Sequence, residues 1–487
     1  MHAALRIDEI LADIAYHQND PKGLTAMALA CKAFYNPAMG ELWRTVDDIH
    51  RLILLLPTGI IHFGQDVDSE GVKSGDWSVL RTATAEEWNH FDQHARRVRE
   101  LCWDTSNVEM VDPDVNLSLL DIMKVYYGQR SAFPRLQALT VNAYCVAKIA
   151  NWTVLASPGL RKLAAPFVHL PMNGAVILPQ ICLTAQSICT LRLKPSITVN
   201  QEAIRIIAQM PRLRQLHLTA IDTIFSSVGR LQGLRYPTFP ALQELQLSVM
   251  YSYGGGDVDL CRDTTSFLRL ISSRSVNTLQ ICHADVAPTQ DSLCAMLKAM
   301  AQFSDTLTTC SVEIAKSELR MVTPQGPRHG SSNSAIPLSA FFPSLLLLGK
   351  ALTCLNLSYV PLDINRHSLY ELLHAYSAVT TLRLGETHPN TSTSLSPDDI
   401  PVFAARCRRL ERLGIPAIYP PEGTNSNTVD SVGPSTSAPS THLLQKLIVG
   451  LQNPGRLCEV HAALVVAQLC FPQAEIRLSL LLPVPQA

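Results

Sequence analysis

Residues 210–218, MPRLRQLHL, decide the fold, because their spacing of apolar residues returns along most of the chain. Leucines at positions 213, 216 and 218 form the pattern L-x-x-L-x-L, and residues 239–247, FPALQELQL, repeat it. Side chains of a β-strand alternate between two faces, so the last two apolar residues of each copy share one face. We therefore expect one short strand per copy, with that face buried.

The copies follow one another from residue 98 to the C-terminal region. They begin at Val98, Leu136, Leu160, Ile188, Leu213, Leu242, Val276, Leu307, Leu352, Val379, Leu410 and Leu444, with the copies at Leu160 and Leu444 the weakest. From Ile188 the starts are 25 to 45 residues apart, and amphipathic helical patterns fill several intervals. Each such unit is too small to fold alone, so neighbours share one apolar column, and their strands run parallel. This predicts an α/β solenoid over residues 96–482, with parallel strands on its concave face.

Three stretches interrupt this pattern. They are rich in Ser, Thr, Pro, Asn and Gly and comprise residues 322–337, 385–397 and 417–441. This composition predicts surface loop insertions between repeats.

The chain begins differently, with residues 5–46, LRIDEILADIAYHQNDPKGLTAMALACKAFYNPAMGELWRTV. Apolar residues at spacings of three and four predict a helix from Ile7 to Ile14. Residues 19–23 predict a turn, a second apolar series runs from Leu24, and residues 36–37 predict another break. Three short helices bury too little surface to be stable alone, so this part must pack against something else.

Three blocks in this N-terminal stretch resemble an F-box. They are residues 7–11, IDEIL, residues 28–34, ALACKAF, and residues 42–44, LWR. The stretch departs from the family at Asp8, where the family has proline, and at Ala30, where it has valine. The resemblance implies an F-box over residues 4–46 that docks a Skp-type adaptor of a cullin-based SCF ubiquitin ligase. The adaptor-binding residues would be Ile7, Asp8, Ile10, Leu11, Leu24, Ala28, Cys31 and Lys32. The apolar members are expected to form an exposed docking patch, and the alternative is an ordinary helical cap on a larger domain.

The repeats resemble the degenerate leucine-rich repeats that follow an F-box in many fungal proteins. Positions that carry Asn or Cys in such repeats hold other residues here, such as Ile221 and Val360. Without an asparagine ladder, the turns are expected to be less uniform.

Residues 47–95 are predicted to be a helical linker. Residues 47–56 predict one helix, and Thr84 with Glu87 forms a capping box that begins another. His90 and His94 lie four residues apart, as metal ligands often do, but no third ligand is placed beside them. We interpret them as two surface histidines and expect no metal site.

Composition narrows the functional classes. The chain has 40 basic and 41 acidic residues, so no excess positive charge favours nucleic-acid binding. Its 13 cysteines are scattered without a Cys-x-x-Cys pair, and no secretory pattern opens the chain, which favours a cytoplasmic or nuclear protein. Residues 163–191 carry no charge over a length that could cross a bilayer, but their prolines and amides favour buried strands and loops. No catalytic motif is present, so we expect neither a cofactor nor enzymatic activity.

The remaining expectation concerns the residue between the last two apolar positions of each repeat. Its side chain points to the open face of the strands. From this row we predict a substrate-binding set that comprises Arg192, His217, Gln246, Gln280, Asn356 and Arg383. The resulting hypothesis is a substrate-recognition subunit of an SCF ligase, with a protein substrate held on the repeats. A non-catalytic scaffold acting without ubiquitin transfer, or a merely solvated sheet face, remains the alternative.

Overall fold

The computed structural model describes most of the N-terminal helices and repeat strands, and fewer of the segments between them. The described residues are 8–18, 20–57, 59–67, 73–79, 81, 83–104, 122–142, 154–166, 185–194, 201–221, 237–250, 260–284, 289–315, 335–358, 360–385, 392–393, 395, 399, 409–415, 446–451 and 475–480. The chain forms two compact units, which we describe separately. The first unit comprises residues 1–224 and 239–241, and the second comprises residues 225–238 and 242–487.

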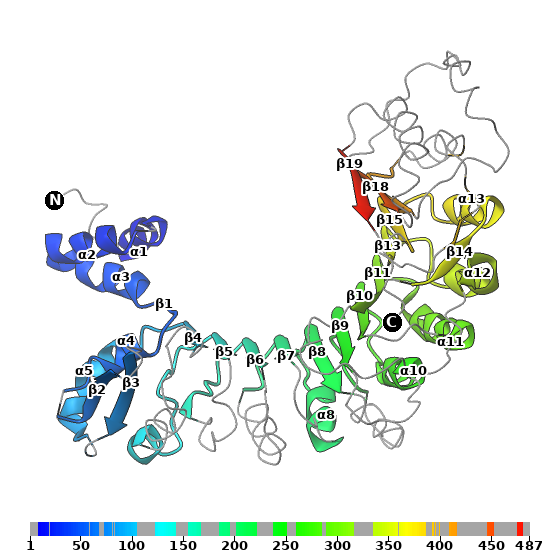
Figure 1. The fold of residues 1–487 in the computed structure, drawn as a ribbon. Helices are drawn as coiled ribbons and strands as arrows, with labels where there is room; N and C mark the ends of the chain where they lie inside the picture. Colours follow the sequence, from blue (N-terminus) through cyan, green and yellow to red (C-terminus); the bar gives the residue numbers. More distant parts are fainter. Residues whose placement is uncertain are drawn as a thin grey trace. The chain divides into compact units, whose positions relative to one another are not determined.

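The first unit begins with three helices, as expected, but their boundaries differ from the prediction. They are α1 (Asp8–His17), α2 (Pro21–Ala30) and α3 (Lys32–Leu42) (Figure 1). The side chain of Asp20 accepts hydrogen bonds from the backbone N–H groups of Lys22 and Gly23, so α2 begins before the expected turn ends.

The break expected at residues 36–37 is wrong, because α3 continues through Pro37. The chain bends instead at Cys31, whose backbone is extended (φ −162°, ψ 158°). A proline inside a helix removes one backbone hydrogen bond. Continuing α3 buries Ala38 in the core of the three helices, which offsets that loss.

The next segment is only partly helical, so the prediction of a helical linker over residues 47–95 is wrong. It contains the short helix α4 (His50–Ile53), then an antiparallel hairpin of β2 (Ile61–Val67) and β3 (Lys73–Val79), and then α5 (Ala85–Ala95). Alternating apolar residues in the hairpin, such as Ile61 and Phe63, were the available sequence signal. The capping box is confirmed: the hydroxyl of Thr84 accepts from the N–H of Glu87, and the carboxylate of Glu87 accepts from the N–H of Thr84.

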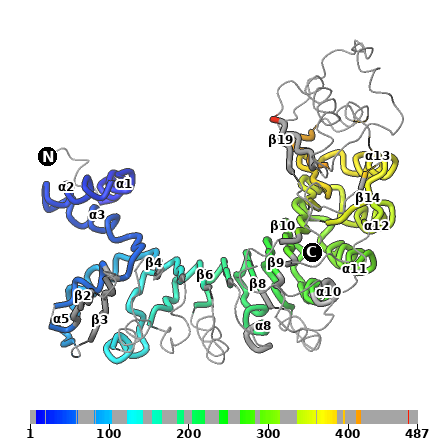
Figure 2. Tube along the Cα trace, viewed as in Figure 1, coloured from blue at the N-terminus to red at the C-terminus, as the bar shows by residue number. Residues whose placement is uncertain are grey.

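A parallel sheet runs through the rest of the first unit. Its strands pair in the order β1 (Thr45–Val46), β4 (Glu100–Asp104), β5 (Ala138–Asn142), β6 (Lys162–Pro166), β7 (Thr190–Lys194) and β8 (Gln215–Ile221). Helix α8 (Gln201–Ala208) joins β7 to β8. Strand β1 was not expected, since it lies inside the stretch assigned to the N-terminal helices. The trace leads from α3 directly to this strand, beside β4 (Figure 2).

The second unit repeats this construction. Its parallel strands pair in the order β9 (Glu244–Met250), β10 (Thr278–Ala284), β11 (Thr309–Ala315), β13 (Cys354–Leu357), β15 (Thr381–Leu384), β17 (Arg412–Ile415), β18 (Lys446–Leu451) and β19 (Glu475–Leu480). Helices α10 (Leu260–Leu270), α11 (Gln290–Met300), α12 (Leu338–Leu346) and α13 (Arg366–Ala375) stack along one side of these strands, and the 3-10 helix η5 (Ala301–Phe303) follows α11 (Figure 1).

A second, smaller parallel sheet lies in this unit as well. It pairs β12 (Ile336–Pro337), β14 (Leu362–Ile364) and β16 (Ser392–Thr393). Strands β12 and β16 fall within residues 322–337 and 385–397, which we had expected to be loops throughout. Each of these strands is two residues long, which is too short for a periodic sequence signal.

The register of the strands confirms the repeat pattern. Every copy of L-x-x-L-x-L provides one strand, and within each unit its second apolar residue pairs with the same position of its neighbour. Leu163 pairs with Leu139 and Leu191, and Cys310 pairs with Leu279 and Leu355. All of these side chains are at most 1% exposed, so they form one apolar column within each unit. The chain is therefore an α/β protein with parallel sheets, an arrangement compatible with an α/β solenoid.

Hydrogen-bonded turns precede the strands. In the second unit the carbonyl of Thr308 accepts from the N–H groups of Thr353 and Cys354, and the carbonyl of Thr353 accepts in the same way from Thr380 and Thr381. The hydroxyls of Thr353 and Thr380 donate to the same two carbonyls, at 3.0 and 3.2 Å. We call these residues the threonine ladder, which bonds each turn to the turn of the preceding repeat.

Candidate functional site

The N-terminal helices bury part of the surface that we had expected them to expose. Leu11, Leu24 and Ala28 are 1%, 6% and 9% exposed, so their assignment to an exposed docking patch is wrong. Leu24 and Ala28 pack with Ala15 and Ala38 in the core of the three helices. Three short helices need these side chains to hold together, because they have few others to bury.

The other predicted adaptor-binding residues divide into three groups. Asp8, Ile10 and Lys32 are exposed, and Cys31 is half-buried. Ile7 lies outside the described residues.

Each of the three helices nevertheless leaves a large apolar side chain in solvent. The exposed fractions are 37% for Ile10 and 41% for Ile14 on α1, 81% for Leu29 on α2 and 45% for Tyr35 on α3. Several large exposed apolar side chains on so small a helical structure favour contact with a protein partner. We refer to Ile10, Ile14, Leu29 and Tyr35 as the apolar helix surface.

The N-terminal helices are joined to the sheet by backbone and side-chain contacts. Only Trp43 and Arg44 separate α3 from β1, and the carbonyl of Arg44 accepts from the N–H groups of Arg99 and Glu100 at 2.9 Å each. The guanidinium of Arg97 donates to Asn36 of α3 at 3.1 Å. These hydrogen bonds fix the N-terminal helices to the first strands of the sheet.

A buried histidine lies at this junction. His94 is 5% exposed, and its ring centroid is 4.5 Å from that of Trp43. Burial, together with the positive charges of His90 and Arg97, lowers the pKa of His94 to about 4. The interpretation of His90 and His94 as two surface histidines is thus wrong for His94, which follows Phe91 on the buried face of α5. Within the described ranges, no group of three or more His, Cys, Asp or Glu side chains could hold a metal ion.

The open face of the first unit carries the predicted row in register. Cys102 pairs with Thr140, and Arg192 pairs with Ala164 and His217. Arg192 is exposed and His217 is half-buried. The structure thus brings these two predicted substrate-binding residues together on adjacent strands.

The row continues independently in the second unit, where one member is not available to a partner. Gln246 pairs with Gln280, and Asn356 pairs with Ser311 and Arg383. Gln246, Gln280 and Arg383 are half-buried, but Asn356 is only 8% exposed.

The amide of Asn356 is committed to hydrogen bonds inside the protein. Its nitrogen donates to the Oε1 atom of Glu313 at 2.7 Å, and its oxygen accepts from the N–H of Ser358 at 3.1 Å. Ser311 donates to the same Glu313 oxygen at 2.7 Å. We therefore withdraw Asn356 from the substrate-binding set, since its amide orders β13. Glu313 was missed, although its position two residues after Ser311 places it on the same face of β11.

Two cysteines on the repeat strands, Cys282 and Cys310, have raised pKa values. Burial raises the pKa of Cys310 to about 12, and burial together with the charge of Glu313 raises the pKa of Cys282 to about 11. A thiol is nucleophilic only as the thiolate, so neither group is activated near neutral pH.

Comparison with known proteins adds no family to these observations. No protein-family model matches the chain, and no similar curated protein is found. No helix among the described residues is long and apolar enough to cross a membrane.

Proposed function

We propose that this chain is the substrate-recognition subunit of a cullin-based SCF ubiquitin ligase. In this proposal α1 to α3 act as an F-box that docks a Skp-type adaptor, and the repeats form a leucine-rich-repeat-like solenoid that holds a protein substrate. The chain itself would be non-catalytic and would work in the cytoplasm or nucleus. Ubiquitin transfer would be performed by other subunits, with proximity as this chain's contribution.

The observation that carries the proposal is the apolar helix surface. The helices expose Ile10, Ile14, Leu29 and Tyr35 although they bury Leu24 and Ala28 tightly, so the exposure is not a result of loose packing. The short connection from α3 to β1 supports the same function, because a receptor must hold its substrate at a fixed distance from the adaptor. On the substrate side, Arg192, His217, Gln246, Gln280 and Arg383 remain the proposed contacts.

The test is co-purification of the full-length chain from cells, scored by mass spectrometry for adaptor and cullin. Leu11→Asp is unsuitable, because Leu11 is buried and its replacement would unfold the helices. The informative variant is Ile10→Asp/Leu29→Asp, which charges two exposed positions on α1 and α2. We expect at least a tenfold loss of adaptor and cullin, since a carboxylate in an apolar interface stays unpaired.

Leu54→Asp is the matched control. Leu54 is 69% exposed and follows α4, outside the N-terminal helices, so this variant should keep the adaptor. Leu29→Asp alone changes the most exposed of these positions, so it tests adaptor binding even if the double variant fails to fold. A parent chain that captures a protein partner but neither adaptor nor cullin would instead support the scaffold without ubiquitin transfer.

A further inference from the structure

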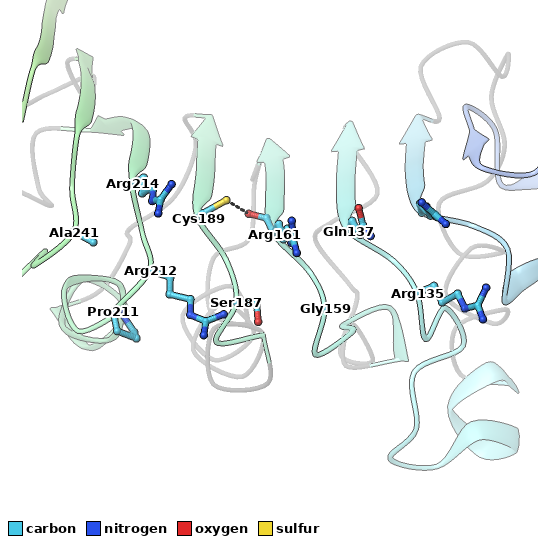
Figure 3. A pocket seen from close by; sticks show the side chains of 11 residues that line it. Arg135, Gln137, Gly159, Arg161, Ser187, Cys189, Pro211, Arg212, Arg214 and Ala241 are labelled. Atoms are coloured by element: carbon cyan, nitrogen blue, oxygen red, sulfur yellow. Dashed lines mark hydrogen bonds between the residues drawn. The ribbon is translucent and has the colours of Figure 1, made fainter. Parts of the chain in front are cut away.

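A basic groove of about 680 Å³ lies within the first unit, beside the starts of β4 to β8 (Figure 3). Its lining includes five arginines, and all five are exposed: Arg99, Arg135, Arg161, Arg212 and Arg214. None of them belongs to the row on the open face of the strands. The groove is therefore a separate surface from the predicted substrate-binding set.

The repeat builds the groove by placing equivalent residues side by side. The residue two positions before the second apolar residue of each repeat is Arg99, Gln137, Arg161, Cys189 and Arg214 in successive repeats. Backbone hydrogen bonds stack these positions: the N–H of Arg161 donates to Gln137, that of Cys189 to Arg161, and that of Arg214 to Cys189, each at 2.8 Å. Charged and uncharged side chains thus alternate along the groove.

A second line of residues runs parallel to the first, two positions earlier in each repeat. It holds Arg135, Gly159, Ser187 and Arg212 in successive repeats (Figure 3). Arg135 precedes β5 and Arg212 precedes β8. Between them the line has only Gly159 and the small side chain of Ser187, which leave the groove open. The groove therefore has positive charge along one line and at both ends of the other.

This charge is not neutralised within the described structure. The groove lining contains no acidic side chain, and among the described residues none of the five guanidinium groups has a carboxylate within 4.0 Å. The complete chain carries a net charge of −1, so the groove is a local concentration of positive charge and not a general property of the surface. Like charges held this close repel one another, and a bound anion relieves the repulsion.

We propose that this groove binds an extended, anionic peptide segment of a protein partner. Neighbouring strands lie about 4.8 Å apart, so arginines on alternate repeats are roughly 10 Å apart, which is the length of about three extended residues. In the polyproline II conformation every third side chain lies on the same face of the segment. A segment in this conformation with an anionic side chain at every third position therefore meets Arg99, Arg161 and Arg214 in turn. Between them, Gln137 and Ser187 provide hydrogen-bonding groups for the backbone of the segment.

The lining favours a peptide over a single-stranded nucleic acid. Proteins that bind single strands combine positive charge with aromatic side chains on which bases stack. The groove lining contains no aromatic residue. Guanidinium groups bind carboxylate and phosphate oxygens through paired hydrogen bonds, so the anionic side chains can be acidic or phosphorylated.

The test uses the full-length chain and fluorescently labelled ten-residue peptides, with affinity measured by fluorescence anisotropy. One Gly/Ser peptide carries glutamate at every third position, a second carries phosphoserine there, and a third carries glutamine. We expect the glutamate peptide, the phosphoserine peptide or both to bind, with the stronger of the two identifying the anion, and the glutamine peptide not to bind. A single-stranded oligonucleotide that binds more tightly than either anionic peptide would overturn the proposal.

Variants then locate the binding. Arg161→Gln/Arg214→Gln should weaken binding at least tenfold and make it less sensitive to salt, because two ion pairs are lost. Arg269→Gln/Arg274→Gln removes the same charge from exposed positions of the second unit and should change nothing. Equal losses in both variants, or none in either, would overturn the proposal.

This inference does not depend on the proposed function. Arg161 and Arg214 precede β6 and β8 and lie outside α1 to α3, so their variants should leave co-purification of the adaptor unchanged. Peptide binding without adaptor capture would refute the ligase proposal alone, and adaptor capture without peptide binding would refute the groove alone.

Discussion

At the scale of single residues, His94 couples protonation to the stability of the junction between the N-terminal helices and the sheet. Its Nδ1 atom is buried without a hydrogen-bond partner among the described residues, and its ring lies against Trp43. An imidazolium would have to be desolvated there, with Arg97 and His90 adding positive charge nearby. The folded state therefore favours neutral His94 far below the usual pKa of about 6.5.

We predict that the stability due to His94 is lost as the pH falls. The pKa of about 4 in the folded chain lies below the unfolded value, so the unfolded chain binds the proton more tightly between these values. Stability is complete above about pH 6.5 and decreases towards pH 4, with a loss of about 2 kcal/mol between pH 7 and pH 5. Urea unfolding of the parent and of His94→Phe at both pH values measures this, because phenylalanine fills the site without titrating. Equal pH dependence in the two proteins would exclude His94 as the cause.

The burial of His94 could have been predicted from spacing, but its residue type argued against it. Trp88, Phe91, His94 and Ala95 follow one another at the spacing of a single helix face. All four are buried. The sequence does not tell whether a polar residue on an apolar helix face is buried or exposed. Its packing partner decides this, and for His94 that partner is Trp43. The same limit applies to Leu11 and Leu24, whose buried face is set by the packing of three helices.

At the scale of elements, the strands could be predicted because each carries two inward apolar residues in a fixed register. The alternation also placed Arg192 and His217 correctly on one face. The two-residue strands β1, β12 and β16 could not be found in this way, since they offer at most one inward residue. The threonine ladder was missed for another reason: its hydrogen bonds lie in turns, where side-chain periodicity gives no information.

We predict that Thr353→Val destabilises the second unit. Valine keeps the shape of threonine but loses the hydroxyl that donates to the carbonyl of Thr308. A neutral hydrogen bond of this kind contributes about 0.5–1.5 kcal/mol, so the free energy of unfolding should fall by that amount. Thr381→Val is the control, because Thr381 lies on strand β15, where valine is favoured. Denaturant midpoints that shift equally in the two variants would show that the ladder contributes no stability.

At the scale of the whole molecule, the basic groove shows what a sequence cannot reveal without its fold. Its arginines come from separate stretches between residues 99 and 214, and only stacked repeats bring them together. The net charge of the chain also gives no sign of the groove, because a balanced charge argues against anionic partners in general. By contrast, the parallel sheet of the repeats was predictable, because the apolar column depends on spacing that recurs many times.

A chain built from stacked repeats should respond locally to a local defect, because each repeat contacts mainly its neighbours. Gly349, in the second unit, has a φ of +92°, and a Cβ atom there would collide with the carbonyl oxygen of Ser304. Gly128, in the first unit, has a φ of +60°, but such a Cβ would have no contact within 4 Å in the described part of the chain beyond its immediate neighbours. Substitution of Gly128 therefore tests the free energy of backbone strain alone, whereas substitution of Gly349 adds the steric collision of the new Cβ atom.

We predict that Gly349→Ala costs roughly 2–4 kcal/mol and Gly128→Ala about 1 kcal/mol, since only the former adds a collision to the backbone strain. Hydrogen exchange should quicken at β11, β13 and α12 in Gly349→Ala, while β4 to β6 exchange as in the parent. Gly128→Ala should leave exchange in the second unit unchanged. If Gly349→Ala accelerated exchange equally in both units, the chain would unfold as one cooperative body, and nearest-neighbour stability would not describe it.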